Sequence, residues 1–170
     1  WGPQTCAEAA GAGHLEVLVG LREDGCEWDK TTCDMAARGG HLKVLVWARE
    51  HGCEWDMLVC SGAAINGHLE VLQWARAHEC PWEQTKICRF AACNGHLDVL
   101  VWAHEVGCPW GESTCAAAAG NGHLEVLQYL HAQGCPWGAT TCTAAARYDK
   151  IELLEWAIAN GCPDDDDDIY

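Results

Sequence analysis

Cysteine and histidine are the residues of this chain with the greatest capacity for chemistry. The 170-residue sequence holds 13 Cys and 9 His. Thiolates and imidazoles bind zinc, and a thiol or hydroxyl beside an imidazole can act as a nucleophile. Zinc sites, however, favour Cys pairs two to four residues apart, and the cysteines of this chain do not recur at that spacing. No Ser, Cys or carboxylate forms a non-repeated constellation with a His. We therefore predict no metal, no cofactor and no enzyme activity.

Twelve of the cysteines recur at two regular positions. One position holds Cys6, Cys33, Cys60, Cys88, Cys115 and Cys142, and the other holds Cys26, Cys53, Cys80, Cys108, Cys135 and Cys162. We interpret them as small buried hydrophobes. Disulfides and bound metal stay open as alternatives, because the seven-residue step from Cys26 to Cys33 would let two thiols meet across a loop. No secretory signal is visible, which favours free thiols and an intracellular location, cytoplasmic or nuclear.

The histidines also follow a repeat. Five of them form a Gly-His pair, at Gly13, Gly40, Gly67, Gly95 and Gly122. Because these His recur at the start of a predicted helix, we expect them to bond to the turn backbone. The other four, His51, His78, His104 and His131, lie in the last turn of a predicted helix, where a cation suits the helix dipole and solvent is accessible.

A repeated phrase must position these residues. The string NGHLEVLQ occurs at 66–73 and again at 121–128. Aligning the glycines, with Asp149 in the sixth place, gives spacings of 27, 27, 28, 27 and 27 residues. Each unit predicts a short helix of about eight residues, such as 31–38, a tight turn at Gly, a longer amphipathic helix and a Gly-Cys-Pro type stop. Neither helix is stable alone, so neighbouring units must stack.

The ten Trp form two ladders along this repeat. Trp1, Trp28, Trp55, Trp82, Trp110 and Trp137 lie in the loops, and Trp47, Trp74, Trp102 and Trp156 lie within the longer helices. A Trp ladder can stack nucleic-acid bases, but large rings more often pack against one another. We expect packing.

The strings TTCDMAARGGHLKVL and STCAAAAGNGHLEVL resemble the ankyrin repeat, with its Ala-Ala pair followed by Gly-His. The resemblance covers 1–162 and implies an all-α, ankyrin-like solenoid of about six helix pairs. The period is 27 rather than the usual 33, and the missing residues fall where ankyrin repeats build a β-hairpin finger. We therefore expect shortened loops that lack fingers. The resemblance also implies a protein-binding scaffold without catalytic activity.

Charge and hydropathy limit the partners. The formal net charge is −15, and Asp164–Asp168 contribute five of the negative charges. This balance argues against nucleic acid and favours a protein partner with a basic surface, within a large complex. No apolar stretch is long enough to span a bilayer. We expect one solenoid domain over 1–163 and a disordered acidic tail over 164–170.

Positions that differ between repeats are candidates for binding, because framework positions maintain the fold. They cluster on the short helix, which lines the concave face in the ankyrin arrangement. The predicted partner-binding residues are Arg38, Met57, Leu58, Ile65, Asn66, Lys86, Arg89, Phe90, Asn94, Asn121, Arg147 and Tyr148. We place the contact centre at Met57, Leu58, Ile65 and Phe90, flanked by Arg38 and Arg89. For Met35 and Phe90, an interior position between repeats is an equal alternative.

The favoured function is a protein–protein interaction scaffold that binds through the short-helix face and adjoining loops. Two alternatives stay open at this point. The chain is a structural subunit of a larger assembly, or it is a Cys-rich metal-binding or redox-responsive protein.

Overall fold

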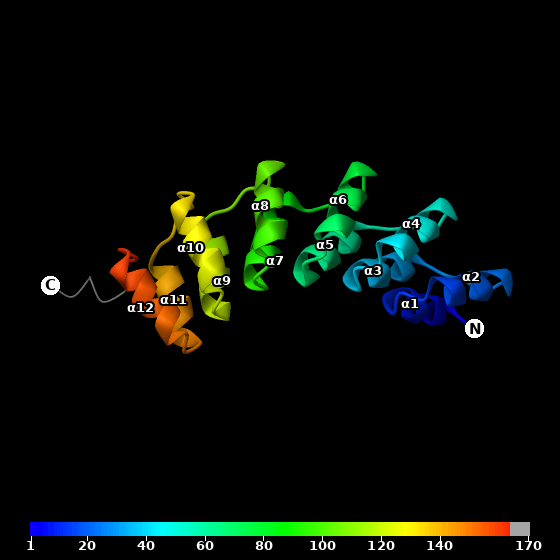
Figure 1. The fold of residues 1–170 in the computed structure, drawn as a ribbon, viewed down its shortest axis with the longest axis horizontal. Helices are drawn as coiled ribbons and strands as arrows, with labels where there is room; N and C mark the ends of the chain where they lie inside the picture. The colour runs from blue at the N-terminus through cyan, green and yellow to red at the C-terminus, as the bar shows by residue number, and fades with distance from the viewer. Residues whose placement is uncertain (164–170) are drawn as a thin grey trace. The chain divides into compact units, whose positions relative to one another are not determined.

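The computed structural model describes residues 1–163, and these residues form helices joined in pairs (Figure 1). The predicted acidic tail, 164–170, lies outside the described residues. Within 1–163 there is no strand, so the expected loss of the hairpin finger is confirmed. The elements are α1 (Pro3–Gly11), α2 (Leu15–Glu23), α3 (Lys30–Arg38), α4 (Leu42–Glu50), α5 (Met57–Asn66), α6 (Leu69–Ala77), α7 (Gln84–Cys93), α8 (Leu97–Glu105), α9 (Glu112–Asn121), α10 (Leu124–Ala132), α11 (Ala139–Arg147) and α12 (Ile151–Ala159).

Two compact units divide the chain, Trp1–Glu83 and a second unit that begins at Gln84. Each contains three repeats, and we call the odd-numbered helix of a repeat helix A and the even-numbered one helix B. In the first unit α3 packs against both α1 and α5, and in the second α9 packs against both α7 and α11 (Figure 1). Each unit is therefore a stack of helix pairs. The single domain expected over 1–163 stays a prediction.

Helix A is as long as helix B, and the expectation of a shorter first helix is wrong. Both kinds have nine or ten residues. The predicted start was set at the Thr-Thr-Cys string, whereas α3 begins at Lys30. Its N-cap is Asp29, whose carboxylate accepts a hydrogen bond from the Thr31 backbone N–H at 2.9 Å. A cap of this kind satisfies an otherwise unpaired N–H and extends the helix toward its N-terminus.

The turn between helices A and B needs a left-handed residue. Gly40 has φ +73°, a conformation that costs a residue with a side chain about 1–2 kcal/mol. The next residue, His41, donates its backbone N–H to the Ala36 carbonyl at 2.9 Å, which pairs a carbonyl at the end of α3. The sixth repeat makes the same turn with Asp149, at φ 54°. The predicted helix–turn–helix is confirmed.

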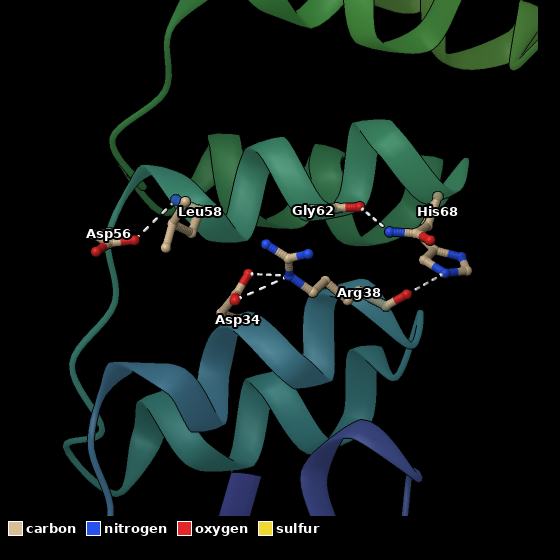
Figure 2. A network of polar contacts seen from close by, with 7 residues as sticks. Asp34, Arg38, Asp56, Leu58, Gly62 and His68 are labelled. Atoms are coloured by element: carbon tan, nitrogen blue, oxygen red, sulfur yellow. Dashed lines mark hydrogen bonds and ion pairs between the residues drawn. The ribbon is translucent and has the colours of Figure 1, made fainter. Parts of the chain in front are cut away.

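The Gly-His imidazoles tie each repeat to the one before it. The Nε2 of His41 lies 3.1 Å from the carbonyl oxygen of Gly11, and that of His68 lies 3.0 Å from the carbonyl oxygen of Arg38 (Figure 2). In the second unit the Nε2 of His123 bonds to the Cys93 carbonyl in the same way, at 3.0 Å. The predicted bond to turn backbone is confirmed. The accepting carbonyl belongs to the last residue of helix A in the preceding repeat, thirty residues back.

The core consists of residues that the repeat keeps constant. In the second to fifth repeats, helix A buries its Cys and the Ala-Ala pair, and helix B buries a Val-Leu pair and a small or branched residue one turn later. In α6 these are Val71, Leu72 and Ala75, each no more than 1% exposed. Full burial of such a Leu contributes about 1.5–3 kcal/mol, which nine-residue helices need because they are not stable in isolation.

Tryptophan packing stabilises the shortened loops, as expected. In the first unit the guanidinium of Arg22 lies 4.3 Å above the Trp28 ring, which meets Trp47 edge to face at 5.7 Å. In the second unit an imidazole replaces the guanidinium, and His131 stacks on Trp137 at 4.1 Å. Ring pairs with these geometries contribute about 0.5–1.5 kcal/mol beyond the area they bury. Most of these rings are half-buried.

Candidate functional site

The exposed surface of the A helices is the candidate site, and we call it the A-helix face. In the first unit it includes Met57 and Leu58 at the start of α5, which are 48% and 43% exposed. The Asp56 carboxylate caps this helix by accepting the Leu58 backbone N–H at 2.9 Å (Figure 2). Asp56 also pairs with Lys30 of the preceding repeat at 2.8 Å, and this hydrogen bond lowers the pKa of the Asp56 carboxyl. Met57 and Leu58 therefore lie in the first turn of a helix whose start is held by the Asp56 cap and the ion pair with Lys30.

Arg38 is held by an ion pair within α3. Its Nε donates to both oxygens of Asp34, at 2.9 and 3.0 Å (Figure 2). The pair fits because α5 carries Gly62 opposite it: a Cβ at Gly62 would lie 2.8 Å from the Arg38 side chain. The residue types at these three positions differ from repeat to repeat. Among the described repeats, only the second and third combine them in this arrangement.

The predicted asparagines have a structural role that the sequence analysis missed. Asn66, Asn94 and Asn121 each donate a side-chain N–H to the carbonyl four residues earlier, at 2.8–2.9 Å. These bonds lie at the C-terminal end of helix A, next to the left-handed Gly. All three side chains are exposed, while the neighbouring Ile65 is half-buried. Each of these Asn side chains thus uses an amide N–H to stabilise the end of its helix. Binding of a partner by these residues stays a prediction.

In the second unit the A-helix face is hollowed by a groove of about 530 Å³. Arg89 from α7 stands at one side, and Ala116 and Ala117 of α9 form part of the lining. Thr140 of α11 donates its hydroxyl to the Glu112 carboxylate at 2.6 Å and lines the groove with it. A second hollow of about 290 Å³ lies along α11 and is lined in part by the predicted Arg147 and Tyr148. Small side chains at these positions leave the space open.

Five lining residues of the larger groove were not among the predicted partner-binding residues: Glu112, Ser113, Ala116, Ala117 and Thr140. A signal for three of them was available. Glu112 is the counterpart in its repeat of Met57, while Ser113 and Thr140 are counterparts of Leu58. Met57 and Leu58 were predicted because they are hydrophobic. Had the prediction followed the aligned positions instead, it would have included Glu112, Ser113 and Thr140.

The remaining predicted residues differ in exposure. Lys86 and Arg89 are exposed, and Phe90 is half-buried with the Arg89 guanidinium 5.9 Å from its ring centre. Met35, for which an interior position was weighed, is 36% exposed and covers Gly11 of the preceding repeat. The predicted contact centre draws Met57, Leu58 and Ile65 from the first unit and Phe90 from the second. That these four residues form a single contact centre stays a prediction.

The repeat cysteines are buried, as expected, and none of the described cysteines is in a disulfide. Their pairing differs from the seven-residue step considered above. The sulfurs of Cys6 and Cys26 lie 3.4 Å apart, and those of Cys115 and Cys135 lie 3.5 Å apart, so thiols twenty residues apart meet inside one repeat. Across residues 1–163, no group of three or more Cys, His, Asp or Glu side chains converges on a metal site.

Trp and Arg side chains line two further clefts, both in the first unit. One cleft, of about 310 Å³, is lined by Arg49, Trp55, Trp74 and His78 among others, and an equivalent cleft of about 340 Å³ lies one repeat earlier. Both are built from residues that recur in the repeat. They are by-products of the Trp packing, in contrast to the groove in the second unit, whose lining changes from repeat to repeat.

Comparison with known proteins identifies the fold. No protein-family model and no curated protein matches the chain. Among solved structures, the chain is similar to the human ASB11 ankyrin repeat domain, with a TM-score of 0.74 over 93% of this chain and 84% of that one. The two are 17% identical in sequence. In the part of the chain that the structure describes, no helix is both long enough and apolar enough to cross a membrane. The chain therefore has the all-α fold of ankyrin repeats, built from units of about 27 residues.

Proposed function

We propose that this protein is a protein–protein interaction module, without catalytic activity, that binds its partner through the A-helix face. One observation carries the proposal: the side chains that vary between repeats are the exposed ones of helix A, while the buried ones recur. Leu58, Arg89 and Tyr148 are exposed and differ from their counterparts in all other repeats. Arg38 is exposed as well, and the same residue type occurs at its position only in the sixth repeat, as Arg147. Exposed apolar groups flanked by Arg are typical of the anchors that dominate interface energetics.

The groove in the second unit supports the same surface. It offers a hollow lined by Ala116 and Ala117, with Arg89 and Glu112 able to form charged contacts at its sides. An extended segment of a partner could insert a side chain there. The formal charge of −15 favours a partner whose surrounding surface is basic, because complementary potentials accelerate association. Membership of a larger complex belongs to the same proposal.

The test is capture of partners by the full chain and by matched variants. Leu58→Asp and Arg89→Glu alter the A-helix face, while Val17→Asp and Lys43→Glu make the same kinds of change on exposed positions of helix B. We expect the two face variants to lose at least one partner that the wild type and both helix B variants retain. Retention of every partner by both face variants would refute the proposed surface.

A further inference from the structure

The paired thiols have a geometry that the binding function does not use. A disulfide bond is about 2.05 Å long, so the sulfurs of Cys6 and Cys26, at 3.4 Å, must approach by a little over 1 Å to form one. The sulfurs of Cys115 and Cys135 lie 3.5 Å apart and would have to approach by a similar distance. Each unit holds such a pair, and in both pairs helix A supplies the first sulfur and the loop after helix B supplies the second. Thiol–thiol hydrogen bonds also form in the first unit between Cys33 and Cys53 and between Cys60 and Cys80.

The second thiol of each pair is the better nucleophile by position. Cys135 is 4% exposed and Cys26 is 3% exposed, whereas Cys115 and Cys6 are fully buried. The hydrogen bond from Cys115 lowers the pKa of the Cys135 thiol, and the same contact, followed by burial, raises the pKa of Cys115. Because the thiolate is the attacking species in thiol–disulfide exchange, Cys135 is placed to react first.

We propose that Cys6–Cys26 and Cys115–Cys135 are redox dithiols that close into intra-repeat disulfides by exchange with a low-molecular-weight disulfide. In the second unit the Cys135 thiolate attacks one sulfur of the small disulfide, and a mixed disulfide forms as one small thiolate leaves. Cys115 then loses its proton and attacks the Cys135 sulfur, which releases the second small thiolate. Two protein thiols are oxidised, one small disulfide is reduced to two thiols, and the two protons end on those thiols.

The fold dictates which cysteines pair. Cys135 also donates to the Gly111 carbonyl at 3.6 Å, and Cys26 to the Gly2 carbonyl at 3.4 Å, so each second sulfur sits between its partner and the start of its own helix A. The resulting bond joins helix A to the loop that follows helix B of the same repeat. It leaves the exposed side of helix A unaltered, so this reaction is independent of partner binding.

The experiment maps disulfides in the full chain. Fully reduced, folded protein is incubated with oxidised glutathione, remaining thiols are alkylated in denaturant, and the chain is cleaved after Glu without reduction. Cleavage after Glu8, Glu112 and Glu125 separates the partners of both pairs into different peptides, and a further cleavage after Trp137 separates Cys135 from Cys142. We expect cross-linked peptides that join Cys6 to Cys26 and Cys115 to Cys135, each lighter by two hydrogens than the sum of its parts.

Cys93 is the internal control for the oxidant. It is half-buried and lies outside the two repeated Cys positions, so we expect it to stop at a mixed disulfide with glutathione. The proposal is overturned if Cys93 is modified while the four cysteines of the proposed dithiols remain free. It is equally overturned if Cys115 joins Cys108 or Cys142, or if pairing in the folded chain is no more selective than pairing in denaturant.

Single-residue variants separate the two steps. With Cys135→Ala, Cys115 should remain a free thiol while the Cys6–Cys26 bond still forms. With Cys115→Ala, Cys135 should accumulate as the mixed disulfide with glutathione, because no second thiol resolves it. A mixed disulfide on Cys115 in the first variant would contradict the assigned order. Should either variant fail to fold, the wild-type peptide map still decides the pairing.

Discussion

The interior of the repeats and the A-helix face differ in how freely their residues change. Inside, Leu45, Leu72, Leu100 and Leu127 occupy the same place in successive repeats and are fully buried. On the face, the counterparts of exposed Leu58 are Gln4, Thr31, Lys86, Ser113 and Thr140. Under the proposed function, this difference assigns folding and recognition to separate sets of side chains. Substitutions in the first set should affect stability, and substitutions in the second should affect binding.

The sharpest contrast is expected from truncating one leucine in each region. Leu72→Ala should lower the free energy of unfolding by about 2–5 kcal/mol, because it removes a fully buried side chain and leaves a cavity. Leu58→Ala, at a side chain 43% exposed, should change it by no more than about 0.5 kcal/mol. Urea unfolding followed by circular dichroism measures both. Equal losses would remove the distinction between the two regions.

A glycine pair tests the inter-repeat histidine contact. Gly40 and Gly52 have φ of +73° and +83°, so Ala at either should cost about 1–2 kcal/mol of backbone strain. A Cβ at Gly40 would also lie 2.5 Å from the His68 ring, whereas a Cβ at Gly52 has no neighbour within 4 Å. Gly40→Ala should therefore destabilise the protein more in denaturant titrations. If Gly52→Ala lowers the free energy of unfolding as much as Gly40→Ala does, the contact between His68 and the turn contributes little to stability.

A smaller effect is expected at the helix cap beneath the exposed Leu58. Asp56→Ala should cost about 1 kcal/mol at neutral pH, while Asp56→Asn should keep the cap and lose only the attraction to Lys30. Since Lys30 depresses the pKa of Asp56, the wild-type carboxylate adds stability above its ordinary pKa of about 3.9, and this gain is lost as pH falls through the lower folded value.

Unfolding free energies measured between neutral and acid pH would check the cap. The gap between wild type and Asp56→Asn should narrow as the solution becomes acid. A gap that stays constant with pH would show that the Lys30–Asp56 ion pair does not stabilise the fold.

The smallest effect is expected at a buried hydroxyl. Thr32 Oγ1 is buried with no hydrogen-bond partner among the described residues, and the third repeat has Val59 in its place. Thr32→Val should therefore raise the free energy of unfolding by up to about 1 kcal/mol. Denaturant titrations would show this gain as a higher unfolding midpoint. Thr114→Val is the matched control, because Thr114 Oγ1 accepts the Gly111 N–H at 3.3 Å. If Thr114→Val raises the free energy of unfolding as much as Thr32→Val does, the gain comes from added hydrophobicity and not from removal of an unpaired hydroxyl.

The repeat made most of the fold predictable, because a period of 27 residues and a Gly-His turn specify a helix pair and its stacking. The thiol pairing could not be read in the same way. Steps of seven and twenty residues both occur between cysteines, and the choice depends on helix B bringing its end back to the start of helix A. The histidine partner was missed for a similar reason, since a bond thirty residues away depends on how two repeats stack.

The candidate site was predictable in part. Variation between repeats located Arg89, Arg147 and Tyr148, and these residues do line hollows of the second unit. It did not locate Glu112 or Thr140, since the groove exists because nearby side chains are small. It also gave no sign that Asn66 bonds to Gly62, since a helix-ending Asn and a partner-binding Asn look the same in sequence.

Backbone hydrogen exchange of the chain, free and bound to a captured partner, tests the division between framework and face most directly. We predict that added protection on binding falls in the A helices, most of all at 57–66 in the first unit or 112–121 in the second. The B helices 42–50 and 124–132 should exchange as they do in the free protein. Protection confined to the B helices would contradict the account.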